Sequence, residues 1–419
     1  MQKSTSRWLK SSSSVVEKCQ VCGYENLEPI LFIGYLPPVN KMHAIGEKPH
    51  EDPSYPAQLL YCPRCHLVQL GLIVDPRILF PPEYPYTSST TRILRDNFAE
   101  LYKEAGSIID LGPDDLIVDI GSNDGNLLTN FKDNHRVLGI TPEEIGRIAI
   151  KRGIPTIIDY FNSHVVKNVL SKYGQARVIT ATNVFAHIQD INTIVEDILR
   201  LLSKDGVFIS ESHYLLPLIE DLQYDTIYHE HLRYYSLHSL KYLLNMHGLE
   251  AIHAKRIPTH GGSIRVYAAR KGRYPVRDTV AKLLKAEKTV VLSKKRLLEF
   301  KHRVVASKLE LYRLLADIKK RGESIYGISA PSRASTLVNY VGIDDGILDC
   351  VLEIKGSHKI DKYMPGTIIP VLEESKLFRD KPGYALILSW HIAGELMRTL
   401  KAKGYKGKFI VPLPDPKIL

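Results

Sequence analysis

The 419-residue sequence has no apolar run long enough to cross a bilayer, so we expect no membrane-spanning helix and no membrane partner. Its first 18 residues are polar and serine-rich and lack the apolar stretch of a secretory signal, so we interpret them as a disordered tail. It also lacks the short-period repeats of solenoid proteins. These absences favour a cytoplasmic protein.

Cysteine is scarce, with five residues in the whole chain. Four of them form two C-x-x-C pairs, Cys19/Cys22 and Cys62/Cys65, while Cys350 lies far away in an apolar segment. In reducing surroundings such pairs favour metal binding over disulfides, although free thiols are an alternative. Two pairs complete the tetrahedron of one Zn²⁺ and leave no open position, which predicts a structural zinc site.

Neither charge nor apolar content is unusual for a soluble protein, at 24% charged and 44% hydrophobic residues. The net charge is nevertheless +10, which suits either a nucleic acid or a small polyanion such as a nucleotide diphosphate. Much of the excess lies in residues 294–321, whose helical periodicity is typical of a solvated helix face.

The pattern of strands predicts an α/β protein with three domains. Residues 19–90 contain short strand-like pieces and proline-rich turns, which indicate a small domain held together by metal. In residues 91–275 strands alternate with helices, which predicts a mostly parallel, Rossmann-like sheet. The strands are expected at 115–120, 136–141, 156–161, 177–188, 206–215 and 261–270, and the helices near 126–132, 143–152 and 191–203.

Residues 276–419 form the third predicted domain. A helical bridge covers 277–322, and the strand spacing of a Rossmann-like α/β unit then returns. Its strands are expected within 324–330, 347–354, 384–389 and 408–414.

The turn "VDIGSNDG", residues 118–125, follows the first strand of the middle domain. Its D-x-G-x-x-x-G spacing is not the G-x-G-x-x-G of dinucleotide sites, and a turn that binds nothing is the alternative. It resembles motif I of class I S-adenosylmethionine (SAM) methyltransferases. The resemblance implies a SAM site at Asp119, Gly121, Asn123, Gly125, Asp159, Tyr160, Phe161 and Asn183. In such enzymes the second strand usually ends with an acidic residue that binds the ribose hydroxyls. Thr141 stands at this position here, and Glu143 or Glu144 can take over the acidic role.

The stretch "YDTIYHEHLRYYS", residues 224–236, is dense in proton-handling groups. Because it follows the fifth strand of a parallel sheet, we expect it over the carboxyl ends of the strands. Tyr228, Glu230 and His231 then face the pocket, where a histidine oriented by a carboxylate is a competent general base. The alternative is a helix that buries the rings, but consecutive His229, Glu230 and His231 cannot all be buried cheaply.

Several segments together resemble the sugar-nucleotide C-methyltransferase family over roughly residues 19–400. They are "YDTIYHEHLRYYSLHSL", "THGGSIRVY", "ESHYLLPLI", "GISAPSRASTLVNYVGI" and "KIDKYMPGTIIPVL". The family has a zinc-binding N-terminal domain, a SAM-binding middle and a C-terminal α/β domain. The resemblance implies a SAM-dependent enzyme that deprotonates the carbon beside the ketone of a nucleotide-linked keto-deoxyhexose and methylates the enolate.

The resemblance also implies roles for individual residues. His231 is the expected base, Tyr228 and Glu230 complete its surroundings, and His187 is a further active-site histidine. Tyr86, or less favourably Tyr84, is expected to reach in from the first domain. In the third domain we assign Arg333, Lys359 and Tyr363 to the substrate, since phosphate favours cationic partners. Arg333 and Ser335 stand where the family often has lysine and asparagine.

Two other classes of function compete with this interpretation. A zinc-containing rRNA methyltransferase would suit the basic charge, but the fourth strand ends in "TNVFAHI" rather than an N-P-P-Y motif, and no aromatic platform for RNA is evident. A sugar-nucleotide-binding protein without catalysis has Thr141 as its only support. We therefore expect no nucleic-acid partner, and a monomer.

Overall fold

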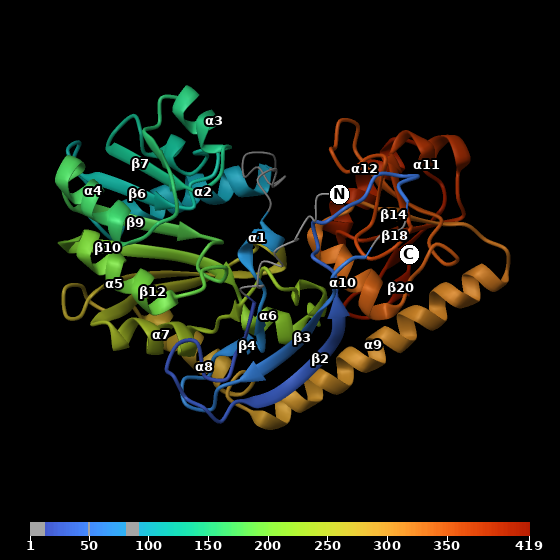
Figure 1. The fold of residues 1–419 in the computed structure, drawn as a ribbon, viewed down its shortest axis with the longest axis horizontal. Coiled ribbons are helices and arrows are strands. Elements are labelled where there is room, and N and C mark those ends of the chain that lie inside the picture. The colour runs from blue at the N-terminus through green and yellow to red at the C-terminus, as the bar shows by residue number, and fades with distance from the viewer. Residues whose placement is uncertain (1–12, 49–50, 81–91) are drawn as a thin grey trace, which may run out of the picture.

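The computed structural model describes residues 13–48, 51–80 and 92–419, and these residues form three larger sheets with their helices and one two-stranded sheet (Figure 1). Among the described residues, no helix is both long and apolar enough to cross a membrane. The predicted fold class is confirmed: strands alternate with helices in the middle part, and the chain begins with a small zinc-binding domain.

The N-terminal part is a small antiparallel sheet with the strand order β11-β4-β3-β2. Along β3 the side chains of Ala57, Leu59 and Tyr61 are buried in alternation, as expected of a strand with one face on the core. Its elements are β2 (Glu28–Leu36), β3 (Tyr55–Tyr61), β4 (Val68–Leu70) and the distant β11 (Arg233–Tyr234), with β1 (Ser14–Val15) on β5 (Leu72–Ile73), followed by α1 (Pro76–Leu79).

The middle part is a seven-stranded sheet with the order β12-β13-β10-β9-β6-β7-β8. The five strands from β8 to β10 are parallel, and β13 runs antiparallel between β10 and β12. All five residues of β6 are buried, as is typical of a parallel strand covered on both faces. The strands are β6 (Leu116–Ile120), β7 (Arg136–Thr141), β8 (Thr156–Ile158), β9 (Ala176–Thr182), β10 (Leu202–His213), β12 (Leu249–Ile257) and β13 (Ser263–Arg270).

Helices and turns connect these strands and cover the faces of the sheet (Figure 1). They are α2 (Arg92–Gly106), η2 (Leu128–Asn130), α3 (Gly146–Lys151), α4 (Ser163–Tyr173), α5 (Ile191–Leu201), α6 (Leu215–Glu220), η3 (Tyr224–Thr226), α7 (Leu237–Met246) and η4 (Thr259–Gly261).

The helix expected near 126–132 is reduced to the single 3₁₀ turn η2. The side chains of Thr129 and Asn130 donate to the carbonyl oxygen of Asn126 at 2.6 and 3.3 Å. Such local side-chain bonds compete with helix propagation. The prediction of an α-helix at this position is therefore wrong.

The third part begins with α8 (Asp278–Lys288) and the long α9 (Lys294–Lys320), which runs diagonally below the C-terminal sheet (Figure 1). The sheet order is β16-β17-β15-β14-β18-β19-β20, with a parallel centre and antiparallel edges. Its elements are β14 (Ile325–Ile328), α10 (Ser332–Val341), β15 (Cys350–Glu353), β16 (Lys362–Tyr363), β17 (Pro370–Glu373), α11 (Ser375–Asp380), β18 (Tyr384–Ile387), η5 (Trp390–Ile392), α12 (Ala393–Ala402), β19 (Lys408–Val411) and β20 (Lys417–Ile418).

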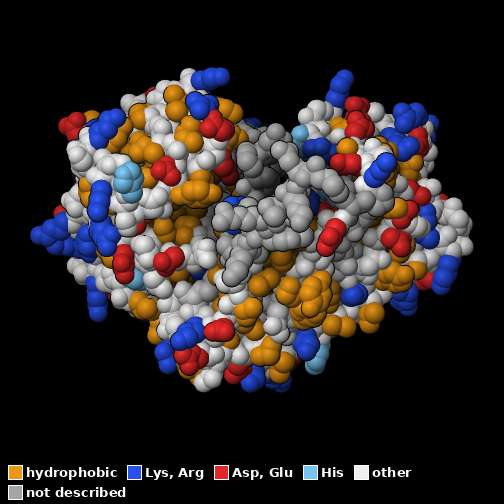
Figure 2. Space-filling model, in the orientation of Figure 1, with side chains coloured by type: hydrophobic (Ala, Val, Ile, Leu, Met, Phe, Trp, Pro, Cys, Tyr) orange, Lys and Arg blue, Asp and Glu red, His pale blue; other side chains and the backbone are white. Residues whose placement is uncertain are grey.

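One hydrophobic core runs through all three parts. It joins Leu36 of β2, Tyr224 of η3 and Leu337 of α10, and α10 packs against both η3 and β2. The segment "YDTIYHEHLRYYS" therefore lies where the three parts meet. In the view of Figure 2 a notch separates the upper ends of the middle and C-terminal parts.

Candidate active site and metal centre

The four paired cysteines meet at one point. The sulfur atoms of Cys19, Cys22, Cys62 and Cys65 all lie within 4.8 Å of one another, and the pairs Cys19–Cys65 and Cys22–Cys62 are 3.4 and 3.5 Å apart. A tetrahedral Zn²⁺ with zinc–sulfur bonds of about 2.3 Å places its ligands about 3.8 Å apart. The donor set therefore fits zinc, and three of the four thiols are buried. With all four positions taken by thiolates, the centre is structural.

The zinc-binding sheet is continuous with the segment that carries His231. Strand β11 pairs with β4, matching Arg233 with Gln69 and Tyr234 with Val68. The backbone N–H of Leu70 also donates to the carbonyl oxygen of Leu232 at 3.0 Å. The residues immediately after His231 are thus part of the zinc-domain sheet.

His231 lies at the carboxyl edge of the central sheet, as the sequence predicts. Its ring is 5.1 Å from the ring of His187, which follows β9, and stacks at 6.2 Å on His213, which ends β10. The ring of Tyr228 is 4.2 Å away. The Nδ1 atom donates to the carbonyl oxygen of Thr226 at 2.9 Å, which leaves Nε2 of the neutral ring as an acceptor.

The structure corrects the expected role of Glu230. Among the described residues, the acceptor that orients the His231 ring is the Thr226 carbonyl and not a carboxylate. The Glu230 carboxylate accepts from Nδ2 of Asn40 at 2.7 Å, and its backbone oxygen accepts from Nδ1 of His187 at 2.6 Å. Neighbouring residues in a tight turn project in different directions, which separates Glu230 from the His231 ring. Tyr86 and Tyr84 lie outside the described residues.

Histidines gather around this point beyond the two that the sequence singled out. His213, His260 of η4 and His391 of η5 join His187 and His231, and burial lowers the pKa of all five. Burial, together with His187, brings the pKa of His231 to about 3. The pKa of His260 falls to about 4. The imidazoles are therefore neutral at pH 7, and a neutral His231 can accept a proton.

The neutral imidazoles predict a pH-dependent stability. The folded pKa of His260 lies below the ordinary value of 6.5, so its contribution is fully present above pH 6.5 and is lost as the pH falls toward 4. We expect wild type to lose unfolding free energy relative to His260→Gln by up to about 1.4 kcal/mol per pH unit in that window. Urea denaturation of both proteins across this range measures the difference. A constant difference between the two would contradict the prediction.

The glycine turn after β6 has the tight backbone expected of a cofactor loop. Gly121 has φ +73°, and a Cβ there would lie 2.3 Å from Val184 Cγ2. Gly125 has φ +79°, and its Cβ would lie 2.8 Å from Ala149. Asn123 also has a positive φ, of 50°. Gly121 thus permits close packing on the loop after β9, and Gly125 permits packing on α3.

Asp119 lies beneath this turn rather than at its surface. Its carboxylate is 2% exposed and accepts from the hydroxyl of Thr180 at 2.6 Å. Burial, reinforced by the nearby Glu211 carboxylate, raises the pKa of Asp119 to about 7. Ser122, in the same turn, has a buried hydroxyl with no partner among the described residues. This hydroxyl lies against β7, where a Cβ on Gly139 would be 2.5 Å from it.

The structure shows which of Glu143 and Glu144 lies close enough to the glycine turn to replace the acidic residue missing at Thr141. Thr141 is buried at the end of β7. Glu143 is directed to the glycine turn, where its carboxylate accepts from Nδ2 of Asn123 at 3.3 Å, and burial raises its pKa. Glu144 is exposed and pairs with Arg147. The acidic group next to the expected cofactor loop is therefore Glu143.

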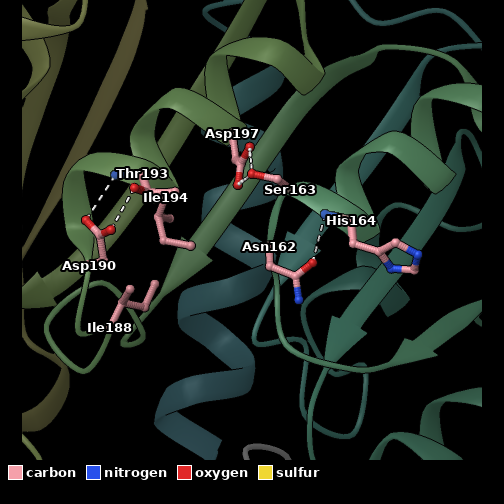
Figure 3. Close-up of a pocket in the computed structure, with 8 residues that line it drawn as sticks. All are labelled: Asn162, Ser163, His164, Ile188, Asp190, Thr193, Ile194 and Asp197. Carbon is pink, nitrogen blue, oxygen red and sulfur yellow. Dashed lines mark hydrogen bonds between the residues drawn. The ribbon is translucent and has the colours of Figure 1, made fainter.

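The expected adenine region follows β8. Tyr160 is 63% exposed, Phe161 is buried, and Asp159 accepts from the backbone N–H of Tyr160 at 2.7 Å. A pocket of about 410 Å³ begins at the next residue, between the start of α4 and the start of α5 (Figure 3). Asn162 caps α4 on one side of it, and Ile188 and Ile194 supply apolar surface on the other.

Asn183 directly follows β9, with φ 57°, and its backbone N–H donates to the Glu211 carbonyl at 2.8 Å. It therefore lies at the carboxyl end of β9, in the same loop as His187. The cofactor residues named from the sequence are thus distributed along one edge of the sheet.

The three residues of the third domain that the sequence assigned to the substrate all bond to other protein groups. Arg333 is buried and forms a two-pronged ion pair with Asp225, so it is not free to bind phosphate through those nitrogens. The Lys359 ammonium donates to the Ala330 carbonyl at 2.5 Å, and burial lowers its pKa. The Tyr363 hydroxyl accepts from the backbone N–H of Gly46 at 3.2 Å and so joins the third domain to the first.

The sequence reasoning missed Asn40, Asp225 and Trp390. Asn40 connects the first domain to Glu230 and also accepts from the Ser332 hydroxyl at 2.9 Å. Trp390 donates to Asp225 at 2.7 Å. Asp225 lies within the quoted tyrosine-rich segment, which was a usable signal, whereas nothing local marks Asn40 or Trp390.

Family models match the chain in three consecutive blocks. A zinc binding domain matches residues 19–80, a methyltransferase domain matches residues 90–254, and a C-methyltransferase C-terminal domain matches residues 258–414. The boundary between the second and third blocks falls within the middle sheet, at the end of β12 and before the start of β13.

Similar proteins include the C-methyltransferase NovU of Streptomyces niveus, which is 30% identical over 96% of this chain and 97% of its own length. Among solved structures, the PH0226 protein from Pyrococcus horikoshii OT3 has 13% identity and a TM-score of 0.36, covering 46% of this chain and 98% of its own. The magnesium protoporphyrin IX methyltransferase ChlM from Synechocystis PCC 6803 has 13% identity and a TM-score of 0.31, covering 42% and 78%.

Proposed function

Because the chain belongs to the family of SAM-dependent C-methyltransferases with a zinc-binding domain, we propose that it methylates the carbon beside a ketone in a nucleotide-linked keto-deoxyhexose. The observation that carries the proposal is the geometry of His231, whose Nδ1 donates to the Thr226 carbonyl and whose ring lies beside those of His187 and Tyr228 at the carboxyl edge of the central sheet. The sugar-nucleotide substrate rests on the resemblance of the "IYHEH" and "HGGS" motifs, which both lie in this region.

His231 acts as the general base in this proposal. A proton bound to a carbon next to a ketone is weakly acidic, so its removal requires a base held within hydrogen-bond reach. The Thr226 carbonyl holds the proton of the neutral ring on Nδ1, and Nε2 is left to take the proton from carbon. The resulting positive charge is costly in the buried site, which favours prompt release of that proton.

Tyr228 supplies the hydrogen bond to the developing enolate oxygen. Its ring lies against that of His231, and burial raises its pKa well above 10, so it retains its proton. A preset donor of this kind typically contributes about 10²–10³ in rate. His187 holds the turn by donating to the Glu230 carbonyl, and Glu230 and Asn40 secure that turn to the first domain.

The residues along the carboxyl edge fit SAM. The glycine turn with Ser122 would hold the amino-acid portion of SAM, Glu143 would accept from the ribose hydroxyls, and Asp159, Tyr160 and Phe161 would border the adenine. Asp119 would act from below by supporting the turn, and Asn183 would contact the cofactor from the end of β9. When bound, SAM supplies the electrophilic methyl group.

The assignment of Glu143 gives a matched pair of variants. We expect Glu143→Gln to weaken SAM binding by about tenfold or more, since a hydrogen bond to a charged group contributes about 1.5–3 kcal/mol. Glu144→Gln removes the same charge one residue later, but its partner is Arg147 on the surface. Calorimetric titration with SAM measures both. Equal affinities in the two variants would remove Glu143 from the ribose site.

The third domain binds the nucleotide in this proposal. Lys359 lies between β15 and β16, where its ammonium donates to Ala330 in the loop that precedes α10, and it is close enough to Glu230 to feel its charge. A lysine there suits a diphosphate as a point charge. Tyr363 lies beside Gly46 of the first domain, whereas Arg333 is engaged by Asp225 through Nε and Nη2 and by the His260 carbonyl through Nη1, so Lys359 is the main candidate for the diphosphate.

The test is incubation of the purified protein with SAM and a panel of 4-keto-6-deoxy sugar nucleotides. We expect one panel member to gain the mass of a single methyl group, retained on carbon after mild acid and base. A protein that binds SAM tightly but methylates no member of the panel would contradict the proposed substrate class.

A further inference from the structure

Asp225 is the most completely enclosed charged residue near His231. Its side chain is 0% exposed and lies in η3, directly before Thr226. Arg333 donates to it through Nε and Nη2, both at 2.7 Å, and the Trp390 indole donates at 2.7 Å. Both donors belong to the third domain, while the acceptor belongs to the middle domain.

The arginine is itself fixed on its other side. Its guanidinium lies over the Trp390 ring, with 4.9 Å from the central carbon to the ring centroid. Its Nη1 points toward the His260 carbonyl and Nδ1 of His391, each at 3.4 Å. A planar guanidinium held by a two-pronged carboxylate and an aromatic face has one orientation, which lysine cannot reproduce.

Helix α10 contacts the segment at two further points. The Thr336 hydroxyl donates to the Ile227 carbonyl at 3.4 Å. Ser332 reaches Glu230 through Asn40. The bonds from α10 therefore act on Asp225, Ile227 and Glu230, on both sides of Thr226 and before His231, and Figure 1 shows α10 on the side of its domain that faces the middle domain.

Thr226 is the residue whose backbone orients the base. Its carbonyl oxygen accepts from Nδ1 of His231 at 2.9 Å. Its hydroxyl donates to the Gln223 carbonyl at 2.7 Å and lies 3.2 Å from Nε2 of His213. The position of this one carbonyl determines both the tautomer and the direction of the His231 ring.

We infer that Asp225 is a positioning residue for the base: through Arg333 and Trp390, the third domain holds the Thr226 carbonyl where it fixes His231 with Nε2 bare and directed at the substrate. The inference rests on the proposed function of His231. It gives the C-terminal domain a part in the proton transfer in addition to nucleotide binding. It also gives Arg333 a role different from the phosphate contact expected from the sequence.

The tests are Asp225→Asn and Arg333→Lys, each of which removes the two-pronged pair. We expect kcat to fall by about 10²-fold, because small displacements of a reacting group have effects of that size. The Kd for SAM is expected to stay at the wild-type value, because the SAM residues lie on other loops. Arg303→Lys is the matched control: Arg303 of α9 donates to the carbonyls of Ile219 and Glu220, another contact with the middle domain that does not reach Thr226.

A second measurement does not depend on turnover. In protein labelled with ¹⁵N-histidine, we expect wild-type His231 to give the separated signals of an imidazole protonated on Nδ1. In Asp225→Asn these signals are expected to move toward the averaged values of a mobile ring. Trp390→Phe keeps the ion pair and removes one donor, so it is expected to fold and to show a smaller change in the same direction.

The outcomes separate this inference from the proposed function. If wild type methylates a keto sugar, but Asp225→Asn and Arg333→Lys keep its kcat and its His231 signals, the positioning role is wrong. If wild type methylates none of the panel while the signals shift as described, the proposed substrate is wrong and the positioning role stands. A variant that unfolds is replaced by Trp390→Phe, for which unchanged His231 signals overturn the inference.

Discussion

His231→Ala is expected to lower turnover by about 10³-fold or more while leaving the affinity for SAM close to wild type. A positioned general base contributes about 10²–10⁴ in rate. In the proposed mechanism the effect falls on the proton transfer, because His231 acts on the sugar and not on SAM. Initial rates with the keto sugar nucleotide, together with SAM titration, measure both quantities.

His229→Gln is the control for that result. His229 is two residues away in the same His-Glu-His string, yet its Nε2 lies 3.2 Å from the Pro56 carbonyl and its ring packs against Tyr55 of the first domain. A glutamine amide can replace this bond, so most of the activity should remain. Loss of SAM binding in His231→Ala to the same degree as turnover would show that its role is not confined to the substrate.

Removal of zinc is the second change with a large expected effect. We expect Cys62→Ser, or prolonged chelation, to abolish zinc content, lower the melting temperature strongly and remove most of the methyltransferase activity. Structural zinc contributes about 10 kcal/mol or more to the folding of small zinc modules. Here β11 belongs to the zinc-domain sheet, and Asn40 of the same domain binds Glu230, so loosening this domain releases the turn that carries His231.

Metal analysis, thermal unfolding and activity are to be measured on the same preparations. Cys350→Ala serves as the control, since Cys350 is a buried thiol in β15 of the third domain, apart from the cysteine cluster. It should keep full zinc content and the activity of wild type. A folded, zinc-free Cys62→Ser protein with normal turnover would show that the zinc sheet does not support the site.

The parallel core of the fold was readable from local pattern alone. Segments such as residues 116–120 and 136–141 are short and apolar and end in turns, so each strand could be placed without reference to its neighbours. The failed helix near 126–132 has the opposite cause. Its apolar spacing is helical, but the side chains of Thr129 and Asn130 take the carbonyl that a helix would need.

In the candidate site, too, features within short motifs were predictable and contacts between distant residues were not. The glycine turn, the cysteine pairs and the position of His231 follow from short-range motifs. The pairing of β11 with β4, the Asn40–Glu230 bond and the Arg333–Asp225 pair join residues that are far apart in the sequence. The sequence motif indicates that Arg333 could bind a phosphate. It cannot show that the buried Asp225 already binds the same guanidinium.

The direction of consecutive side chains was also beyond the sequence. His229, Glu230 and His231 read as one proton-handling unit, yet they bond to Pro56, Asn40 and Thr226 respectively. The turn geometry, which is set by contacts with all three domains, decides which of them can serve as the proposed base.

The central claim, that His231 removes a proton from the carbon beside the ketone, is tested most directly by solvent exchange. Protein is incubated in D₂O with the keto-deoxyhexose nucleotide and S-adenosylhomocysteine, so that no methyl group can be transferred. We expect deuterium to enter at the carbon next to the ketone with wild type and not with His231→Ala. Equal incorporation by the two proteins would contradict the account.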